Sequence, residues 1–114
     1  MPLHPFTAPD AGAWLATLVP GELTLLYKHS PSCGISFEAA DEVRDFAVAE
    51  RRVRVVQLDV IRQRPLSQAL AQALNVTHQS PQVILLDGST PVWHTSHSRI
   101  RTATLIDQVQ ARLS

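Results

Sequence analysis

The sequence is poor in cysteine: Cys33 is the only one among 114 residues. A single cysteine cannot form an internal disulfide, so any disulfide of this chain must join it to another molecule. Such scarcity is typical of proteins that work in a reducing compartment, and we expect a cytoplasmic location. Residues 1–6 lack a basic segment followed by an apolar stretch, so no secretory signal is predicted there.

The sequence also lacks an excess of charge of one sign and long apolar runs. Ten basic and ten acidic residues give a formal net charge of zero, which is not the electrostatic footprint of a nucleic-acid-binding protein. No apolar run approaches the ~20 residues that span a bilayer. We therefore expect neither nucleic acid nor a membrane as partner. The length, with 45% hydrophobic residues, predicts one domain over residues 1–114.

The spacing of apolar residues predicts alternating helices and strands. A short helix capped by Asp10 comes first. It is followed, in order, by strand 23–28, helix 34–50, strand 53–60, helix 65–74, strand 82–86, strand 91–95 and helix 100–112. Within the helix 34–50, Phe37 and Phe46 are both expected to belong to a packed inner face.

Local signals predict how several elements begin and end. Pro65 suits the first turn of its helix, and Asn75 suits the end of that helix. Residues 87–90, which begin with Asp-Gly, are predicted to form a four-residue hairpin loop. Ser98 or Thr102 is the expected cap of the last helix.

The order of these elements predicts an α/β fold. A strand–helix–strand unit joins parallel strands by a right-handed crossover, and a hairpin joins antiparallel strands. Together they make a mixed four-stranded sheet with helices on both faces, which is the thioredoxin-like arrangement. This topology brings four segments to one edge of the sheet, where ligands of open α/β sheets bind. The segments are the stretch around Cys33, residues 59–64, residues 80–81 and residues 93–97.

Cys33 follows strand 23–28 and precedes helix 34–50, so we expect it at a helix start. A helix N-terminus has unpaired N–H groups and partial positive charge, which favour the reactive thiolate. Lys28 and His29 add donors or positive charge nearby in the sequence. The alternative is a buried structural thiol that packs as a small hydrophobic side chain. The polar strand-to-helix position favours a reactive thiol.

In this setting the chain resembles the monothiol bacilliredoxin family of small thioredoxin-fold proteins, over residues 14–109. The resemblance rests on several segments that occur together and in order: Lys28-His29-Ser30 before Cys33, Ile35-Ser36 after it, Asp59-Val60-Ile61 with Arg64-Pro65 and Ser67, residues 78–82, and residues 93–97. It implies thiol–disulfide exchange with bacillithiol, a low-molecular-weight thiol that some bacteria use instead of glutathione. The reaction would remove bacillithiol from mixed disulfides on client proteins.

The resemblance also assigns catalytic roles. Cys33 would attack the bacillithiol sulfur, and an outside thiol would release it, because Ser36 stands where a dithiol enzyme carries its second cysteine. Ser36 would donate a hydrogen bond to the sulfur. In thioredoxin-like proteins the proline at the position of Pro81 is cis and touches the catalytic sulfur. The residue before it, here Ser80, offers its backbone to an extended substrate.

The remaining expected substrate-binding residues surround this centre. Lys28 and His29 would favour the thiolate, while Gly34 replaces a proline that the family commonly has and restores one N–H. Carboxylates of bacillithiol would be met by arginine and histidine side chains, which we expect to be Arg62, Arg64 and His97. The alternative for the two arginines is a pair of solvated loop charges.

Bacillithiol would thus be a co-substrate, with no bound cofactor, no metal and a monomeric protein. Two other functions stay open. The Cys33-Gly34-Ile35-Ser36 segment is similar to the cysteine-glycine-phenylalanine-serine motif of monothiol glutaredoxins, which share a [2Fe–2S] cluster between two protomers. The other glutaredoxin signatures are absent. In the second alternative, Cys33 is a redox sensor in a non-catalytic binding module.

Overall fold

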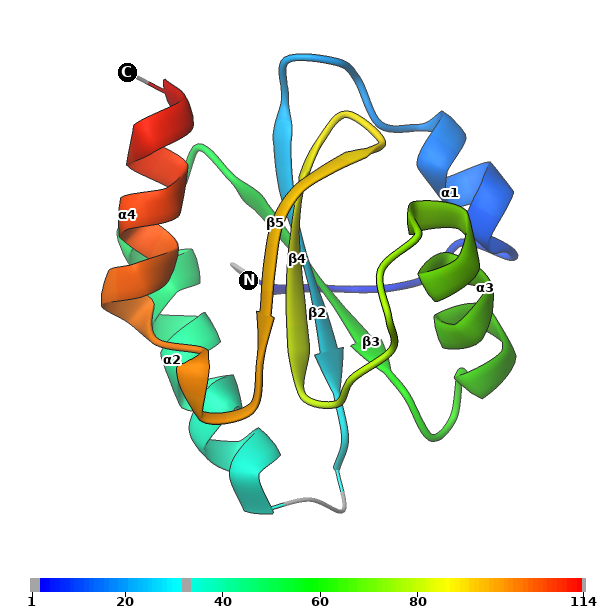
Figure 1. Cartoon of the computed structure of the whole chain (residues 1–114), viewed down its shortest axis with the longest axis horizontal. Helices are drawn as coiled ribbons and strands as arrows, with labels where there is room; N and C mark the ends of the chain where they lie inside the picture. The colour runs from blue at the N-terminus through cyan, green and yellow to red at the C-terminus, as the bar shows by residue number, and fades with distance from the viewer. Residues whose placement is uncertain (1–2, 32–33, 114) are drawn as a thin grey trace.

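A mixed β-sheet lies between two pairs of helices (Figure 1). The structure is a computed structural model that describes residues 3–31 and 34–113, with Ile35 described by its backbone only. Its elements are, in order, β1 (Leu3–Pro5), α1 (Ala11–Ala16), β2 (Leu23–His29), α2 (Gly34–Ala49), β3 (Arg54–Asp59), α3 (Arg64–Leu74), β4 (Gln82–Asp87), β5 (Thr90–Ser96), the 3₁₀ helix η1 (His97–Arg99) and α4 (Thr102–Leu113).

The sheet has the strand order β1-β3-β2-β4-β5. β3 pairs in parallel with β1 and β2, and β4 pairs antiparallel with β2 and β5. This confirms the thioredoxin-like mixed sheet. The predicted count of four strands was one too few, because β1 has only three residues and shows no alternating pattern long enough to identify it.

The two faces of the sheet carry separate cores. α2 and α4 cover one face, and α1 and α3 cover the other (Figure 1). Side chains of the central strand β2 alternate between them, so Leu25 and Tyr27 join the first core while Leu26 joins the second. The prediction of helices on both faces is confirmed.

Two helix ends follow the local signals in the sequence. Asp10 caps α1, and its Oδ1 accepts a hydrogen bond from the backbone N–H of Ala13 at 2.7 Å. Asn75 ends α3 in the left-handed conformation, with φ of 55°.

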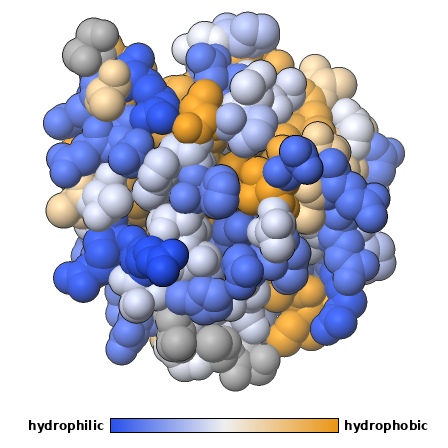
Figure 2. All heavy atoms as spheres, viewed as in Figure 1, coloured by the Kyte–Doolittle hydropathy of each residue, from blue (hydrophilic) through white to orange (hydrophobic). Residues whose placement is uncertain are grey.

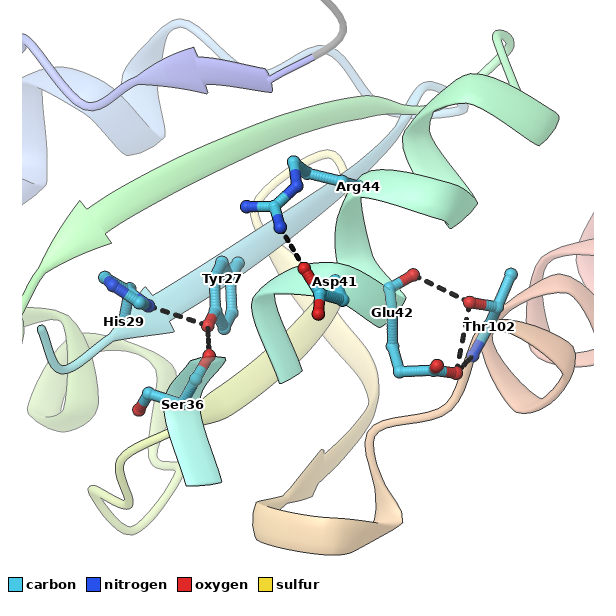
Figure 3. A network of polar contacts seen from close by, with 7 residues as sticks. All are labelled: Tyr27, His29, Ser36, Asp41, Glu42, Arg44 and Thr102. Atoms are coloured by element: carbon cyan, nitrogen blue, oxygen red, sulfur yellow. Dashed lines mark hydrogen bonds and ion pairs between the residues drawn. The ribbon is translucent and has the colours of Figure 1, made fainter. Parts of the chain in front are cut away.

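The start of α4 does not follow the local sequence. The helix begins at Thr102, later than the predicted residue 100, and the Thr102 hydroxyl donates to the carbonyl oxygen of Glu42 and does not cap its own helix. Among the described residues, no hydrogen bond joins the Ser98 side chain to the start of α4. Instead Glu42 on α2 accepts a hydrogen bond from the backbone N–H of Thr102 at 2.8 Å (Figure 3). The cap comes from a distant helix, so the local sequence could not show it.

The β4–β5 hairpin is tighter than predicted. Asp87 pairs with Thr90, so the loop has two residues, Gly88 and Ser89, and not four. Gly88 has φ of +56°, and a Cβ there would lie 3.0 Å from the Cα of Pro20. Both the conformation and the close approach therefore require glycine.

Phe37 is on the surface, whereas Phe46 is in the core. Their exposed fractions are 58% and 0%, so the prediction that both belong to the packed face of α2 was wrong for Phe37. Nine residues correspond to two and a half helical turns, which place the two rings on opposite sides. In the view of Figure 2, hydrophobic side chains form separate patches between hydrophilic ones. Among the described residues, no helix is long and apolar enough to cross a bilayer.

Candidate functional site

The ends of four strands line up at one edge of the sheet, at the bottom of Figure 1. His29 pairs with Asp59 in the parallel register. Lys28 pairs with Gln82, which in turn pairs with Ser96 in the antiparallel register. Segments far apart in the sequence therefore meet here, as the topology predicts.

Backbone hydrogen bonds fix the connections that leave this edge. The N–H of Val60 donates to the carbonyl of His29 at 3.0 Å, which ties the β3–α3 connection to the end of β2. The N–H of His97 donates to the carbonyl of Pro81 at 3.0 Å, which ties the end of β5 to the start of β4.

Ser36 is completely buried in the first turn of α2. Its Oγ accepts a hydrogen bond from the backbone N–H of Ser30 at 3.3 Å, and its carbonyl accepts one from the Tyr27 hydroxyl at 3.1 Å. Cys33 lies outside the described residues, so the hydrogen bond from Ser36 to its sulfur stays a prediction. α2 begins at Gly34, directly after Cys33 in the sequence.

His29 is held from several sides. Its Nδ1 lies 2.8 Å from the hydroxyl of the buried Tyr27, and its ring meets Phe37 edge-on with centroids 6.4 Å apart. Burial lowers the pKa of His29, with Arg44 also lowering it and Asp59 raising it. The ring is therefore mostly neutral at pH 7, so of the two expected contributions of His29, a hydrogen-bond donor or a positive charge, the charge is the one that the lowered pKa does not support. Sequence reasoning missed Tyr27, although its position two residues before His29 puts both on one face.

Lys28 points to the opposite face of the sheet and is completely buried. Its Nζ donates to the carbonyl of Ser67 in α3 at 3.1 Å and lies 3.4 Å from Nδ1 of His78. Burial lowers the pKa of Lys28 to about 8. At pH 7 the amine is still mostly charged, which places a cation beneath the edge. The sequence predicted this cation but not the partners Ser67 and His78.

The Ser80–Pro81 peptide bond is cis, as the resemblance implied. The segment before it is anchored by the buried Gln82, whose Nε2 donates to the carbonyl of Thr77 at 3.0 Å and whose Oε1 accepts from the N–H of Gln79 at 3.4 Å. The Oγ of Ser80 is buried, and no described residue hydrogen-bonds it. The Ser80 hydroxyl, which can both donate and accept a hydrogen bond, therefore lies beside the cis proline.

The basic side chains expected to bind carboxylates lie around the edge and are exposed. Arg62 follows β3, with its side chain 88% exposed and its Nε 4.0 Å from Asp59. Arg64 begins α3, and its charge helps to lower the pKa of His78. His97 follows β5 and has a backbone φ of 56°, a left-handed conformation that residues other than glycine rarely adopt. Their contacts with a ligand stay predictions.

Metal binding at this edge would need several ligating side chains close together. Within residues 3–31 and 34–113, no group of three or more histidine, aspartate or glutamate side chains is arranged to hold a metal ion. The [2Fe–2S] alternative depends on the thiolate of Cys33, which lies outside these residues.

The family model described as monothiol bacilliredoxin BrxC matches residues 15–105. The chain belongs to this family. Membership places it among thiol–disulfide oxidoreductases, and the matched range includes the cis proline and the buried Ser36.

Solved structures agree with the thioredoxin fold. A candidate oxidoreductase with a thioredoxin fold is 27% identical, with a TM-score of 0.79 over 92% of this chain and 91% of that one. Thioredoxin f from spinach chloroplast is 16% identical, with a TM-score of 0.75 over 98% of this chain and 87% of that one. A mutant thioredoxin from Halobacterium salinarum is 17% identical, with a TM-score of 0.75 over 98% and 91%. The two thioredoxins show the fold alone.

Proposed function

We propose that this chain removes bacillithiol from mixed disulfides on client proteins through Cys33, as a cytoplasmic monomer without a bound cofactor. The family match over residues 15–105 carries the proposal. It is supported by the absence of a second cysteine in the sequence and by the burial of Ser36 in the position where a dithiol enzyme would carry one.

The reaction has two exchange steps. The Cys33 thiolate attacks the bacillithiol sulfur of the client, a new S–S bond forms between them, and the client cysteine leaves as a thiolate that takes up a proton. A second thiol, bacillithiol or another reductant, then loses its proton and attacks the bacillithiol sulfur on Cys33. Cys33 leaves as a thiolate, and the two small thiols leave joined by a disulfide.

Two features support a stable thiolate at this edge. The charge of Lys28 is buried at the end of β2, on the face covered by α3, where the low local polarity strengthens its electrostatic attraction for an anion. α2 starts at Gly34, and a helix N-terminus attracts negative charge. Cys33 directly precedes that start in the sequence.

Substrate recognition uses groups that surround the edge. We infer that Arg62, Arg64 and His97 receive the carboxylates of bacillithiol, because arginine binds carboxylates with a fork of two N–H donors. The backbone of Ser80 and its hydroxyl, which no described residue hydrogen-bonds, receive the client segment beside its disulfide.

The direct test is the intact mass of the protein after incubation with the disulfide of bacillithiol. We expect one bacillithiol adduct on the wild type and none on Cys33→Ser. The neutral disulfide of mercaptoethanol serves as a matched substrate without carboxylates and should react more slowly at equal concentration. An adduct that survives Cys33→Ser, or no adduct on the wild type, would overturn the proposal.

A further inference from the structure

The imidazole of His78 lies against a buried polar cluster. His78 belongs to the connection between α3 and β4, which runs to the edge of the sheet where β4 begins (Figure 1). Its Nδ1 lies 3.4 Å from the amine of Lys28 in β2 and 3.4 Å from the hydroxyl of Ser67 in α3. Lys28 and Ser67 are buried, whereas His78 is exposed. One nitrogen of the ring is thus held from inside the protein by two different elements.

The backbone on both sides of His78 is also fixed. The buried Gln82 accepts a hydrogen bond from the N–H of Gln79 at 3.4 Å through its Oε1, and its Nε2 donates to the carbonyl of Thr77 at 3.0 Å. Gln82 in turn pairs with Lys28 in the register of β2 and β4. Two neighbouring buried residues therefore set the position and the orientation of His78. Little conformational freedom is left for this side chain to lose when a ligand binds.

The contacts of Nδ1 determine which nitrogen of His78 carries the proton. An ammonium group only donates, and the amine of Lys28 is mostly charged at pH 7 because its pKa is about 8. Nδ1 of His78 therefore accepts. Burial, Lys28 and Arg64 lower the pKa of His78, so the ring is neutral at pH 7 and its single proton is on Nε2. Within residues 3–31 and 34–113 this N–H has no hydrogen-bond partner, which leaves it available to a ligand.

The charges around His78 favour an anion. Lys28 and Arg64 both act on the ring as positive charges. Among the described residues, neither of these cations forms an ion pair with a carboxylate. An anion that accepts the Nε2–H of His78 is therefore also attracted by two cations that no acidic side chain neutralises.

We propose that His78 is a further substrate-binding residue, whose Nε2–H donates to a carboxylate of the small thiol, and that Lys28 is the residue that positions it. This inference rests on the proposed function, in which the small thiol is bacillithiol. His78 comes two residues before the cis Ser80–Pro81 bond, so a carboxylate bound there lies beside the segment expected to receive the disulfide. The role also explains a buried amine without a carboxylate partner, because that amine orients the ring and adds positive charge.

The binding role is tested by comparing two variants with two disulfides. His78→Asn keeps an acceptor for Lys28 but has no group at the position of Nε2, whereas the longer side chain of His78→Gln places an N–H donor there. With the bacillithiol disulfide, we expect the rate constant of adduct formation to fall about tenfold in His78→Asn and to stay within about twofold of the wild type in His78→Gln. With the neutral disulfide of mercaptoethanol, both variants should react like the wild type. His4→Asn, in strand β1, is the matched control and should leave both rates unchanged.

A second measurement follows binding without any chemistry at the cysteine. S-methyl bacillithiol keeps the carboxylates but cannot form a disulfide. At saturation it should raise the pKa of His78, measured by NMR titration of the ring, because a bound carboxylate favours the protonated imidazole. The methyl ester of the same compound, which lacks the negative charges, should leave the pKa where it is. Failure of S-methyl bacillithiol to bind, or an unchanged pKa of His78 at saturation, would overturn the proposal.

The outcomes separate this inference from the proposed function. If the wild type forms no adduct with the bacillithiol disulfide, the proposed function fails. If the wild type forms it and His78→Asn slows both disulfides by the same factor, His78 only supports the structure, and this inference alone is overturned. A wild-type rate of His78→Asn with the bacillithiol disulfide would also overturn it, as would a His78→Gln variant as slow as His78→Asn.

Discussion

The hydroxyl of Ser36 accepts a hydrogen bond from the backbone N–H of Ser30 at 3.3 Å. Both residues are buried, and they bracket Cys33 in the sequence. Ser36 therefore has a structural role in closing this segment, in addition to standing where a dithiol enzyme has its second cysteine.

Replacing Ser36 with cysteine should convert the chain from a monothiol into a dithiol. We expect Ser36→Cys to form an internal disulfide with Cys33, because the thiol is close in size to the hydroxyl and the spacing is that of dithiol oxidoreductases. After oxidation with the bacillithiol disulfide, the intact mass should show the loss of two hydrogen atoms and no adduct. Ser36→Ala, the matched control, should keep the adduct. A stable adduct on Ser36→Cys would contradict this prediction.

Lys28 should lower the free energy of unfolding at neutral pH. Its buried amine is charged there, and it donates to a carbonyl oxygen and not to a carboxylate. Lys28→Met keeps the length of the chain and should raise the free energy of unfolding at pH 7 by about 1–3 kcal/mol.

The stability gained in Lys28→Met should become smaller as the pH rises. The pKa of Lys28 is about 8 in the folded state and 10.5 ordinarily, so between these values the unfolded state binds more protons. The wild type should therefore gain stability as the pH rises from 8, and its difference from Lys28→Met should narrow. Urea unfolding of both proteins at pH 7 and 9.5 measures this, and an unchanged difference would be evidence against it.

Gly34 can be replaced without a clash. Apart from its chain neighbours, no atom of the described residues lies within 4 Å of a Cβ built there, and its φ is not in the left-handed region. Gly34→Ala should thus stabilise the protein by about 0.5–1 kcal/mol. Gly34→Pro also removes one N–H from the start of α2, so we expect a higher pKa of the Cys33 thiol than in Gly34→Ala. The pH dependence of alkylation measures both pKa values, and equal values would show that this N–H does not stabilise the thiolate.

Glu42 should stabilise α4 from α2. Its carboxylate accepts from the backbone N–H of Thr102, and this hydrogen bond is the largest cause of its lowered pKa. Glu42→Ala should lower the free energy of unfolding by about 1–2 kcal/mol at pH 7. Glu42→Gln, which keeps an acceptor, should lower it by about 0.3–1 kcal/mol.

At low pH the wild type should no longer be more stable than Glu42→Gln. Because the folded pKa lies below the ordinary value of 4.5, the charge contributes fully above that value and its contribution is lost as the pH falls through the folded pKa. The difference between wild type and Glu42→Gln in chemical denaturation should close at low pH. A difference that is independent of pH would mean that the charge contributes nothing.

Much of the fold could be predicted because apolar periodicity and turn residues are local signals. The core strands, α2 and α3 follow them closely, and Asp10 and Asn75 mark helix ends where expected. β1 was missed because it is short. The cap of α4 was missed because Glu42 is 60 residues from Thr102, and no local rule relates the two.

In the candidate site, too, the features that depend on local sequence could be predicted and those that depend on distant residues could not. Pro81 and Ser36 could be found from motifs, because their positions relative to the cysteine and to a strand start are fixed in the fold. The burial of Lys28 could not, since it depends on Ser67 and His78, which are 39 and 50 residues away. The neutral state of His29 likewise depends on its burial, whereas the sequence left open whether this residue adds a donor or a positive charge.

The central claim is best tested by transfer from a client protein with one bacillithiolated cysteine, mixed with one equivalent of this chain and no other thiol. We expect the client to return to its free thiol mass while one bacillithiol moves to Cys33, and Cys33→Ser to leave the client unchanged. A client that keeps its bacillithiol, or that is freed equally by Cys33→Ser, would show that Cys33 does not remove bacillithiol.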